Sequence, residues 1–203
     1  MLMGLAVGFL GNSFNSQAKK QSRHLISIIK YAYNQANVSG HVYRLVFDMD
    51  EQTYWLEEGP DKVVVSAKDA DKDESKKKSK KETDNPDKEN NDEEKGGASE
   101  ETDEADEPKT AANSFMPVDS DVVKKVNLGD VVYLRDIFVT HQTGIAEEGQ
   151  SYLYFFPTGI TEFAVIHLSN EEHNYSYTLI VNPVSGVVKV ENDYIEYESL
   201  LEK

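Results

Sequence analysis

The sequence predicts an α+β fold in which one long N-terminal helix packs on antiparallel β-sheet, with a long disordered, charged insertion between two parts of the sheet. Three observations carry this prediction. Residues 1–37 have the spacing of a continuous helix, the regions on either side of residues 67–113 contain short aromatic or β-branched runs, and residues 67–113 themselves carry no apolar side chain other than alanine.

The predicted helix has two parts of different character. Met1 to Leu10 carries no charge. From Phe14 onward apolar residues recur at i, i+3, i+4, i+7 and i+11, and this stripe consists of Leu25, Ile28, Ile29, Ala32 and Ala36. We expect the stripe to pack on the sheet and the cations Lys19, Lys20, Arg23 and Lys30 to face solvent or a neighbouring molecule. The dipeptide Ser39-Gly40 ends the helix.

Strand signals begin directly after the helix. Residues 41–47 alternate with period two and should form a hairpin with residues 53–57 through the acidic turn 48–52. Val63 to Val65 is either a third strand or the entry to the insertion. Downstream runs at 131–139, 152–156, 162–168, 175–181 and 187–190 indicate antiparallel meanders, with turns near 157–159 and 182–186. Residues 193–203 form a short helix or an edge strand, and we favour the helix.

The insertion stands out by its composition. Between Ser66 and Ser114 there are 17 acidic residues and 10 lysines, and no aromatic or branched aliphatic residue. Such a segment cannot bury enough apolar surface to offset the entropy of ordering its backbone. We therefore divide the chain into an apolar helix end (1–13), the amphipathic helix with the first hairpin (14–66), the disordered insertion (67–113) and the remaining sheet (114–203).

Charge and cysteine content exclude several classes of function. The net charge of -16 disfavours non-specific binding to nucleic acid or to an anionic membrane surface. The chain contains no cysteine, which excludes disulfides, thiolate metal sites and cysteine nucleophiles within it.

Several segments, in order, resemble the minor pseudopilins of the GspH/FimT family, which are pilin-like subunits of type II secretion systems and type IV pili. The helix with Tyr31-Ala32 and Ala36 leads to Ser39-Gly40 and then to residues 42–48 and 54–56. Farther on come Phe155-Phe156-Pro157-Thr158-Gly159 and residues 180–190. Each segment alone is common, but the ordered set is moderately specific and covers most of residues 2–60 and 128–190.

The resemblance implies a structural role without catalysis or cofactor. The chain would assemble by its N-terminal helix into the tip of a periplasmic pseudopilus that supports protein export, after the helix has held it in the bacterial inner membrane. Its partners would be the GspG-like major pseudopilin and the GspI-, GspJ- and GspK-like minor pseudopilins. The implied assembly residues are Leu5, Val7, Phe9, Leu10, Leu25, Ile28, Ile29 and Ala32, and the implied turn residues of the head are Gly40, Pro157, Gly159, Pro183 and Gly186.

The sequence departs from the family in two places. Relatives open with a cleaved leader, a Phe, a glutamate and about twenty apolar residues, which suffice to cross a bilayer. Here Met1 to Leu10 would span only about 15 Å as a helix, so we expect the native N-terminus to extend before Met1. The charged insertion is the second departure; if it is a loop, deleting residues 68–112 should leave the head folded.

Motifs for catalysis or metal binding are missing from the sequence. The histidines His24, His41, His141, His167 and His173 are scattered, which predicts positions on the surface or at sheet edges. The acidic run from Asp69 to Asp73 resembles a calcium loop, but Glu74 stands where glycine is required and Lys80 where glutamate is required. Asp48, Asp50 and Glu51, or Asp119 and Asp121, are expected to be solvated turn carboxylates that bind a cation weakly at most.

Two other functions remain open at this point. The chain could be a FimT/FimU-like minor pilin of a type IV pilus, some of which take up DNA, although the charge of -9 outside the insertion disfavours nucleic acid. It could instead be a soluble β-rich binding domain or enzyme. A deep pocket with convergent carboxylates would favour the soluble domain, whereas a sheet packed on one long projecting helix would argue against it.

Overall fold

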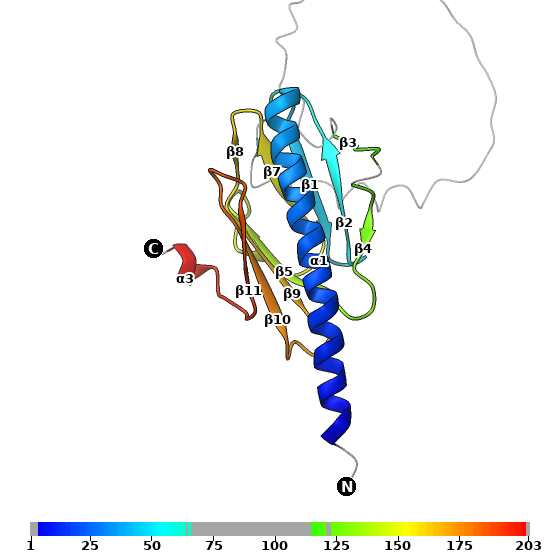
Figure 1. Cartoon of the computed structure of the whole chain (residues 1–203). Helices are drawn as coiled ribbons and strands as arrows, with labels where there is room; N and C mark the ends of the chain where they lie inside the picture. The colour runs from blue at the N-terminus through cyan, green and yellow to red at the C-terminus, as the bar shows by residue number, and fades with distance from the viewer. Residues whose placement is uncertain (1–3, 64, 66–114, 121–122, 202–203) are drawn as a thin grey trace, which may run out of the picture.

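The computed structural model describes residues 4–63, 65, 115–120 and 123–201, with side chains from residue 13 onward. The predicted insertion at 67–113 lies outside the described residues. One long helix, α1 (Gly4–Ser39), is followed by eleven strands and a short C-terminal helix within the described part of the chain. At 36 residues, α1 is about 54 Å long, and its N-terminal end projects beyond the sheets (Figure 1).

The strands form two antiparallel sheets. The first sheet has the order β3-β2-β1-β7-β8, and β4 also pairs with β2. Its strands are β1 (Tyr43–Asp48), β2 (Thr53–Glu58), β3 (Met116–Pro117), β4 (Val126–Asn127), β7 (Gln150–Phe156) and β8 (Ile160–Thr161). The second sheet has the order β11-β10-β9-β5-β6. Its strands are β5 (Tyr133–Val139), β6 (Ile145–Ala146), β9 (Ala164–Ser169), β10 (Ser176–Val181) and β11 (Val188–Glu191).

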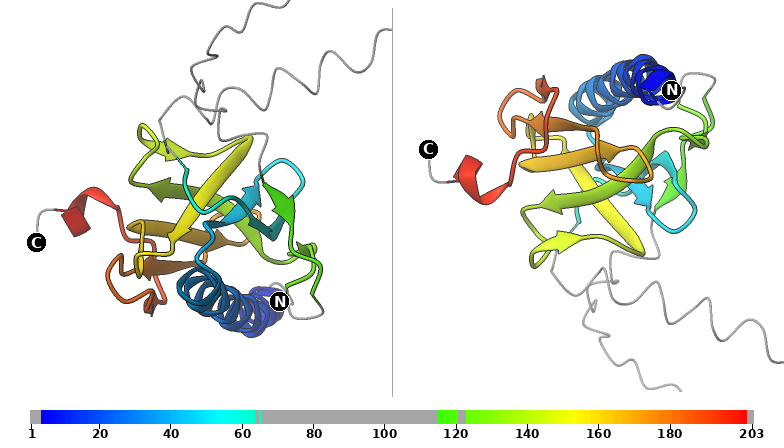
Figure 2. Two further views of the ribbon diagram at one scale, coloured as in Figure 1. Left: turned by 90° about the horizontal axis from the view of Figure 1, so that it is seen from above. Right: turned by 90° about the horizontal axis from the view of Figure 1, so that it is seen from below.

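The larger hydrophobic core lies between the helix and the inner faces of both sheets. It contains Leu25 and Ile29 of α1, Leu45 and Phe47 of β1, and Ile166 of β9, all buried. The two views in Figure 2 show α1 alongside both sheets and not embedded between them. A smaller apolar cluster on the outer face of the first sheet is built on Val42, Val46, Tyr152 and Tyr154.

The predicted fold class is confirmed, since a long N-terminal helix packs on antiparallel sheets. The helix ends at Ser39, and Gly40 follows with a φ of 78°, the left-handed conformation that favours glycine at this position. The hairpin of β1 and β2 has the predicted turn, and the C-terminal tail ends in the short helix α3 (Glu198–Leu201). No strand is described at residues 63 and 65.

The predicted order of the later strands is wrong in one respect. A simple meander would place β7 beside β5, whereas β7 pairs with β1 and β5 pairs with β9. The predicted strand at 162–168 corresponds to β9 but starts two residues later, because residues 162 and 163 connect β8 of the first sheet to β9 of the second. Local spacing gives strand positions, but it does not specify which sheet a strand joins.

Candidate functional site

Where α1 packs on the head, one face of the helix is buried. Leu25, Ile28, Ile29 and Ala32, four of the predicted assembly residues, are at most 1% exposed. Lower on the helix, Phe14 contacts the ring of Tyr175, just before β10, and the ring of Tyr177 in β10, each with a centroid distance of 6.0 Å. Leu5, Val7, Phe9 and Leu10 belong to α1 by their backbone, and the part that these eight residues play in assembly stays a prediction.

Tyr33 ties the upper end of α1 to both sheets. Its hydroxyl lies 2.8 Å from the carbonyl oxygen of Gly159, in the β7–β8 turn, and 2.9 Å from that of Val184, in the β10–β11 turn. Gly186 has a φ of 63°, and a Cβ atom there would lie 2.7 Å from the Tyr33 ring. This position therefore needs glycine both for its backbone conformation and for the close approach of the ring.

The turn residues taken from the family pattern converge at this end of the head. Pro157 and Gly159 lie in the β7–β8 turn, and the carbonyl oxygen of Pro183 accepts a hydrogen bond of 2.8 Å from the Thr161 amide. Gly40 lies at the neighbouring end of α1, where its amide bonds the carbonyl oxygen of Ala36. Sequence reasoning missed Tyr33, although a tyrosine beside the buried stripe was the available signal.

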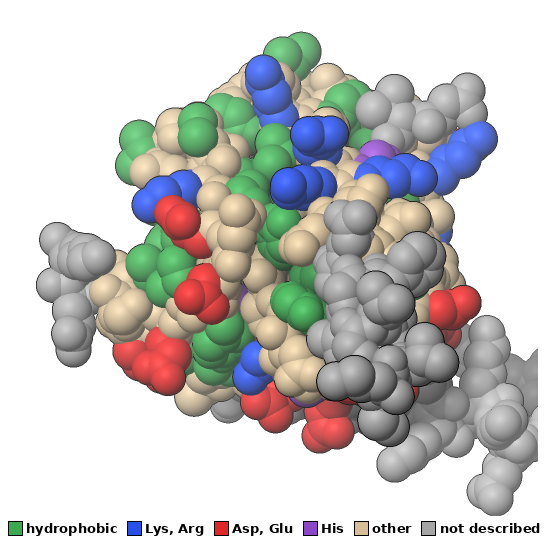
Figure 3. All heavy atoms as spheres, turned by 60° about the horizontal axis from the view of Figure 1, so that its bottom comes forward, with side chains coloured by type: hydrophobic (Ala, Val, Ile, Leu, Met, Phe, Trp, Pro, Cys, Tyr) green, Lys and Arg blue, Asp and Glu red, His purple; other side chains and the backbone are tan. Residues whose placement is uncertain are grey.

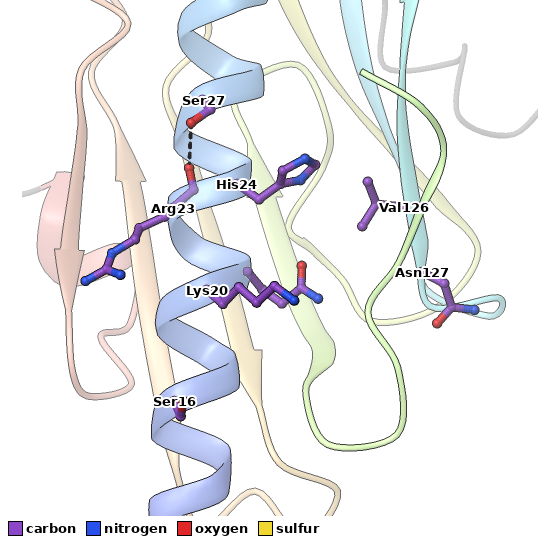
Figure 4. Close-up of a pocket in the computed structure, with 8 residues that line it drawn as sticks. Ser16, Lys20, Arg23, His24, Ser27, Val126 and Asn127 are labelled. Atoms are coloured by element: carbon purple, nitrogen blue, oxygen red, sulfur yellow. Dashed lines mark hydrogen bonds between the residues drawn. The ribbon is translucent and has the colours of Figure 1, made fainter. Parts of the chain in front are cut away.

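The opposite face of α1 is polar and basic. Lys19, Lys20, Arg23 and Lys30 are exposed. A shallow groove of about 690 Å³ runs between α1 and the segment of β4, lined by Ser16, Lys20, Gln21, Arg23, His24, Ser27, Val126 and Asn127. In Figure 4, Lys20 and His24 lie on the side of α1 toward Val126, while the Arg23 guanidinium extends to the other side.

His24 and Tyr54 connect the helix to β2 at the floor of this groove. His24 Nδ1 lies 2.8 Å from the hydroxyl oxygen of Tyr54. Burial raises the pKa of Tyr54, so the phenol stays protonated and can donate to the imidazole. The pair holds α1 in place, and Lys20, one turn nearer the N-terminus, is exposed (Figure 4).

A buried ion pair lies on the outer face of the first sheet. Arg44 and Glu57 are direct cross-strand neighbours in the β1–β2 hairpin, and Arg44 Nε lies 2.6 Å from Glu57 Oε2. The guanidinium is also stacked on the rings of Phe115 and Tyr152, at 4.2 and 4.5 Å from their centroids. Burial is the largest influence and acts to lower the pKa of Arg44, but Glu57 and Tyr154 together outweigh it and the pKa rises, so the guanidinium stays ionised.

Two histidines contradict the prediction of surface or edge positions. His167 is 1% exposed; its Nδ1 lies 2.5 Å from Asp136 Oδ1 and its Nε2 lies 3.0 Å from the carbonyl oxygen of Ile195. The His141 side chain is also buried, with Nδ1 2.7 Å from Glu162 Oε1. Scattered positions in the sequence indicated exposure, but strand pairing brings each ring onto a carboxylate from another segment.

In the acidic turn between β1 and β2, Asp48 differs from the prediction of solvated carboxylates, whereas Asp50 and Glu51 are exposed. Asp48 is 3% exposed and accepts hydrogen bonds from the Glu51 amide and from Gln150 Nε2. Asp50 accepts one from the Gly149 amide, and Glu51 pairs with Lys125. These carboxylates therefore join the turn to β7 and to the β4 segment. Asp119 is exposed, whereas Asp121 and the acidic run 69–73 lie outside the described residues.

Within the described ranges, no group of three or more His, Asp or Glu side chains is arranged to hold a metal ion. Over the same part of the chain, no helix is long and apolar enough to cross a membrane.

The fold is similar to that of solved protein structures. No family model matches the chain, and no curated protein sequence matches it. A crystal structure of the minor pseudopilin EpsH from the type II secretion system of Vibrio cholerae is similar, with 10% identity, a TM-score of 0.51 and coverage of 89% of this chain and 97% of that chain. A second EpsH structure from the same organism gives 8% identity, coverage of 87% and 97%, and a TM-score of 0.47. The chain thus has the pilin-like fold of a minor pseudopilin: a long N-terminal helix packed on antiparallel sheets.

Proposed function

We propose that this chain is a structural minor pseudopilin of a bacterial type II secretion system. It assembles through its N-terminal helix into a periplasmic pseudopilus that supports protein export. The observation that carries the proposal is helix α1, which lays one face on both sheets of the head while its N-terminal end projects beyond them (Figure 1). The similarity of the fold to EpsH supports the same assignment.

The projecting end of α1 is the part proposed to assemble. Apolar residues Leu5, Val7, Phe9 and Leu10 would pack with helices of neighbouring subunits and, before assembly, would hold the protein in the inner membrane. The proposed partners are a GspG-like major pseudopilin and GspI-, GspJ- and GspK-like minor pseudopilins. No catalytic step, cofactor or metal is part of this function.

The arrangement of the head argues against a soluble enzyme or a carbohydrate-binding domain. A sheet packed on one long projecting helix is expected of a pilin-like subunit and not of these alternatives. The groove beside α1 is lined by Lys20, Gln21 and Asn127 among others, and it contains no carboxylate. Paired carboxylates would be needed there for glycoside hydrolysis.

Single-cysteine cross-linking in the native host tests the proposal. The chain contains no cysteine, so Gln17→Cys on the exposed face of α1 would introduce a unique thiol. We expect cross-links from this position to other pseudopilins carrying matching cysteines, and we expect deletion of the gene to stop export by the secretion system. Thr143→Cys, in an exposed turn of the head, is the comparison position.

Two results would contradict the proposal. Cross-linking to the pilins of a type IV pilus, with normal export and lost pili in the deletion strain, would assign the chain to a pilus instead. A protein that cross-links to neither kind of subunit, and whose deletion changes neither process, would not be a pilin-like subunit at all.

A further inference from the structure

The exposed face of α1 carries charge of one sign only. The first acidic residue of the chain is Asp48, so α1 contains no carboxylate, although the chain as a whole has a net charge of -16. The cations of α1 are Lys19, Lys20, Arg23 and Lys30, and all four are exposed. We call these four residues the basic face. Figure 3 shows how Lys and Arg side chains gather over the upper half of one side of the molecule, while Asp and Glu lie mainly below.

The four cations are aligned along the helix. With about 100° of rotation per residue they lie within an arc of about 100°, opposite the buried stripe. Between Lys19 and Lys30 they extend over about 16 Å of the helix axis. Exposed positions between and beside them on this side of the helix are small or polar, such as Ser16, Ser27 and Asn34.

In the described part of the chain, the basic face lacks the acidic partners that Lys125 and Lys189 have. Lys125 lies 2.8 Å from Glu51, and Lys189 lies 2.7 Å from Glu191. Among the described residues, no carboxylate lies within ion-pair distance of the four cations on α1. Beside Lys20, the groove of about 690 Å³ offers amide donors of Gln21 and Asn127 that suit carboxylate oxygens.

We propose that the basic face binds an acidic protein surface on a neighbouring pseudopilin, which lies alongside α1 in the assembled fibre. The inference rests on the proposed function, and it adds the chemistry of the contact. Charge complementarity of this kind sets the register and the choice of partner more than it sets the affinity. The surface that fits carries Asp or Glu side chains spread over about 16 Å parallel to the helix.

The geometry favours a protein partner over two other polyanions, a membrane surface and nucleic acid. The cations follow the helix axis, whereas a layer of lipid headgroups crossing an inserted helix would meet them at one level only. Nucleic acid is disfavoured because the net charge of -16 repels it and because the lining of the groove contains no Phe, Tyr or Trp ring on which a base could stack.

A charge-neutralised variant tests the proposal. In Lys19→Gln, Lys20→Gln, Arg23→Gln and Lys30→Gln combined, glutamine keeps the helix propensity and removes four positive charges. The matched control removes the same charge from the rest of the head through Lys62→Gln, Lys124→Gln, Lys125→Gln and Lys189→Gln. The full-length proteins are compared by the amount of partner pseudopilin cross-linked through Gln17→Cys, after circular dichroism has shown equal folding.

We expect the basic-face variant to lose about tenfold in cross-linking yield, and the control to stay within about twofold of the parent. The parent's yield should also fall as salt is raised, because exposed charges are screened. Equal yields from the two variants would overturn the basic-face proposal while leaving the proposed function intact. A parent that cross-links to no pseudopilin would overturn both.

Two direct binding measurements complete the test. The parent should bind neither vesicles containing phosphatidylglycerol through the basic face nor duplex DNA at physiological salt. If vesicles or DNA bind the parent, if the basic-face variant loses that binding, and if its cross-linking stays unchanged, the partner is a polyanion other than a pseudopilin and the proposal is wrong.

Discussion

The outer faces of the two sheets are covered in different ways. On the first sheet, Arg44 and Glu57 form a buried ion pair, and Phe115 lies over it. On the second sheet, His167 and Asp136 form the pair, and the C-terminal segment lies over it through Tyr194 and the Ile195 carbonyl. Both sheets thus bury a cross-strand polar pair on the side away from α1, but the second sheet pairs its carboxylate with an imidazole in place of a guanidinium.

The difference shows how each cover is held. Arg44 pairs with the residue directly across its own hairpin, so its partner is local and the cover is added on top. His167 bonds Asp136 of the neighbouring strand, and its second ring nitrogen donates a hydrogen bond to the Ile195 carbonyl oxygen of the tail, so pair and cover form one network. Breaking the pair on the first sheet should therefore destabilise the whole head. Breaking the pair on the second sheet should release the C-terminal segment.

The largest effect is expected from breaking the pair on the first sheet. Arg44→Ala leaves the buried carboxylate of Glu57 without its counter-ion, which should lower the free energy of unfolding by about 3–5 kcal/mol in urea titrations. Replacing both residues, in Arg44→Leu with Glu57→Leu, should restore most of the loss because no unpaired charge remains. A double variant as unstable as the single one would contradict this account.

A smaller effect is expected at the second sheet. His167→Leu removes the link to the tail, but Asp136 keeps Arg135 at 3.3 Å, so we expect a loss of about 1–3 kcal/mol. Limited proteolysis should cut the segment 192–201 faster than in the parent, while the sheets remain resistant. Unchanged cleavage of the tail would show that the network does not hold it.

The aromatic stack between the second sheet and the C-terminal segment is expected to contribute less to stability. Phe138 stacks on Tyr197 with a centroid distance of 4.1 Å and an interplanar angle of 13°. Phe138→Leu keeps an apolar side chain and loses the stacking, which should cost about 0.5–1.5 kcal/mol in thermal or urea unfolding. On the first sheet, the ring of Phe156 stacks on Tyr154 with a centroid distance of 6.4 Å, so Phe156→Leu is the matched substitution. A larger loss of stability from Phe156→Leu than from Phe138→Leu would reverse the comparison.

The smallest effect is expected from an exposed ion pair at the edge of the first sheet. Lys125 and Glu51 lie 2.8 Å apart, but their side chains are 52% and 55% exposed. Lys125→Ala should change stability by no more than about 1 kcal/mol, and the change should shrink in high salt. A loss comparable to that of Arg44→Ala would mean that burial does not explain the difference between the two pairs.

Periodicity predicted the parts of the fold that depend on near neighbours. The stripe of Leu25, Ile28, Ile29 and Ala32 is buried as its spacing indicated, and Gly40 follows the end of the helix. The hairpin register also places Arg44 opposite Glu57, so this pair could have been read from symmetry about the turn at 48–52. Residues close in sequence restrict one another's position and conformation independently of how the rest of the chain folds.

The pairs His141–Glu162 and His167–Asp136 could not be predicted in this way. Each joins segments whose relation depends on which strands enter which sheet, and a bulge at Arg135 further shifts Asp136 into line with His167. The contact of Tyr33 with two turns far along the chain depends on the same arrangement.

The sequence by itself therefore determined the long helix, its buried and basic faces, and the antiparallel character of the head, because these follow from the order of side chains along a regular backbone. The tertiary structure alone decided the division into two sheets, the partners of the buried histidines and the convergence of two turns on Tyr33. These features depend on contacts between distant segments, whose free energy arises only when the whole head has folded.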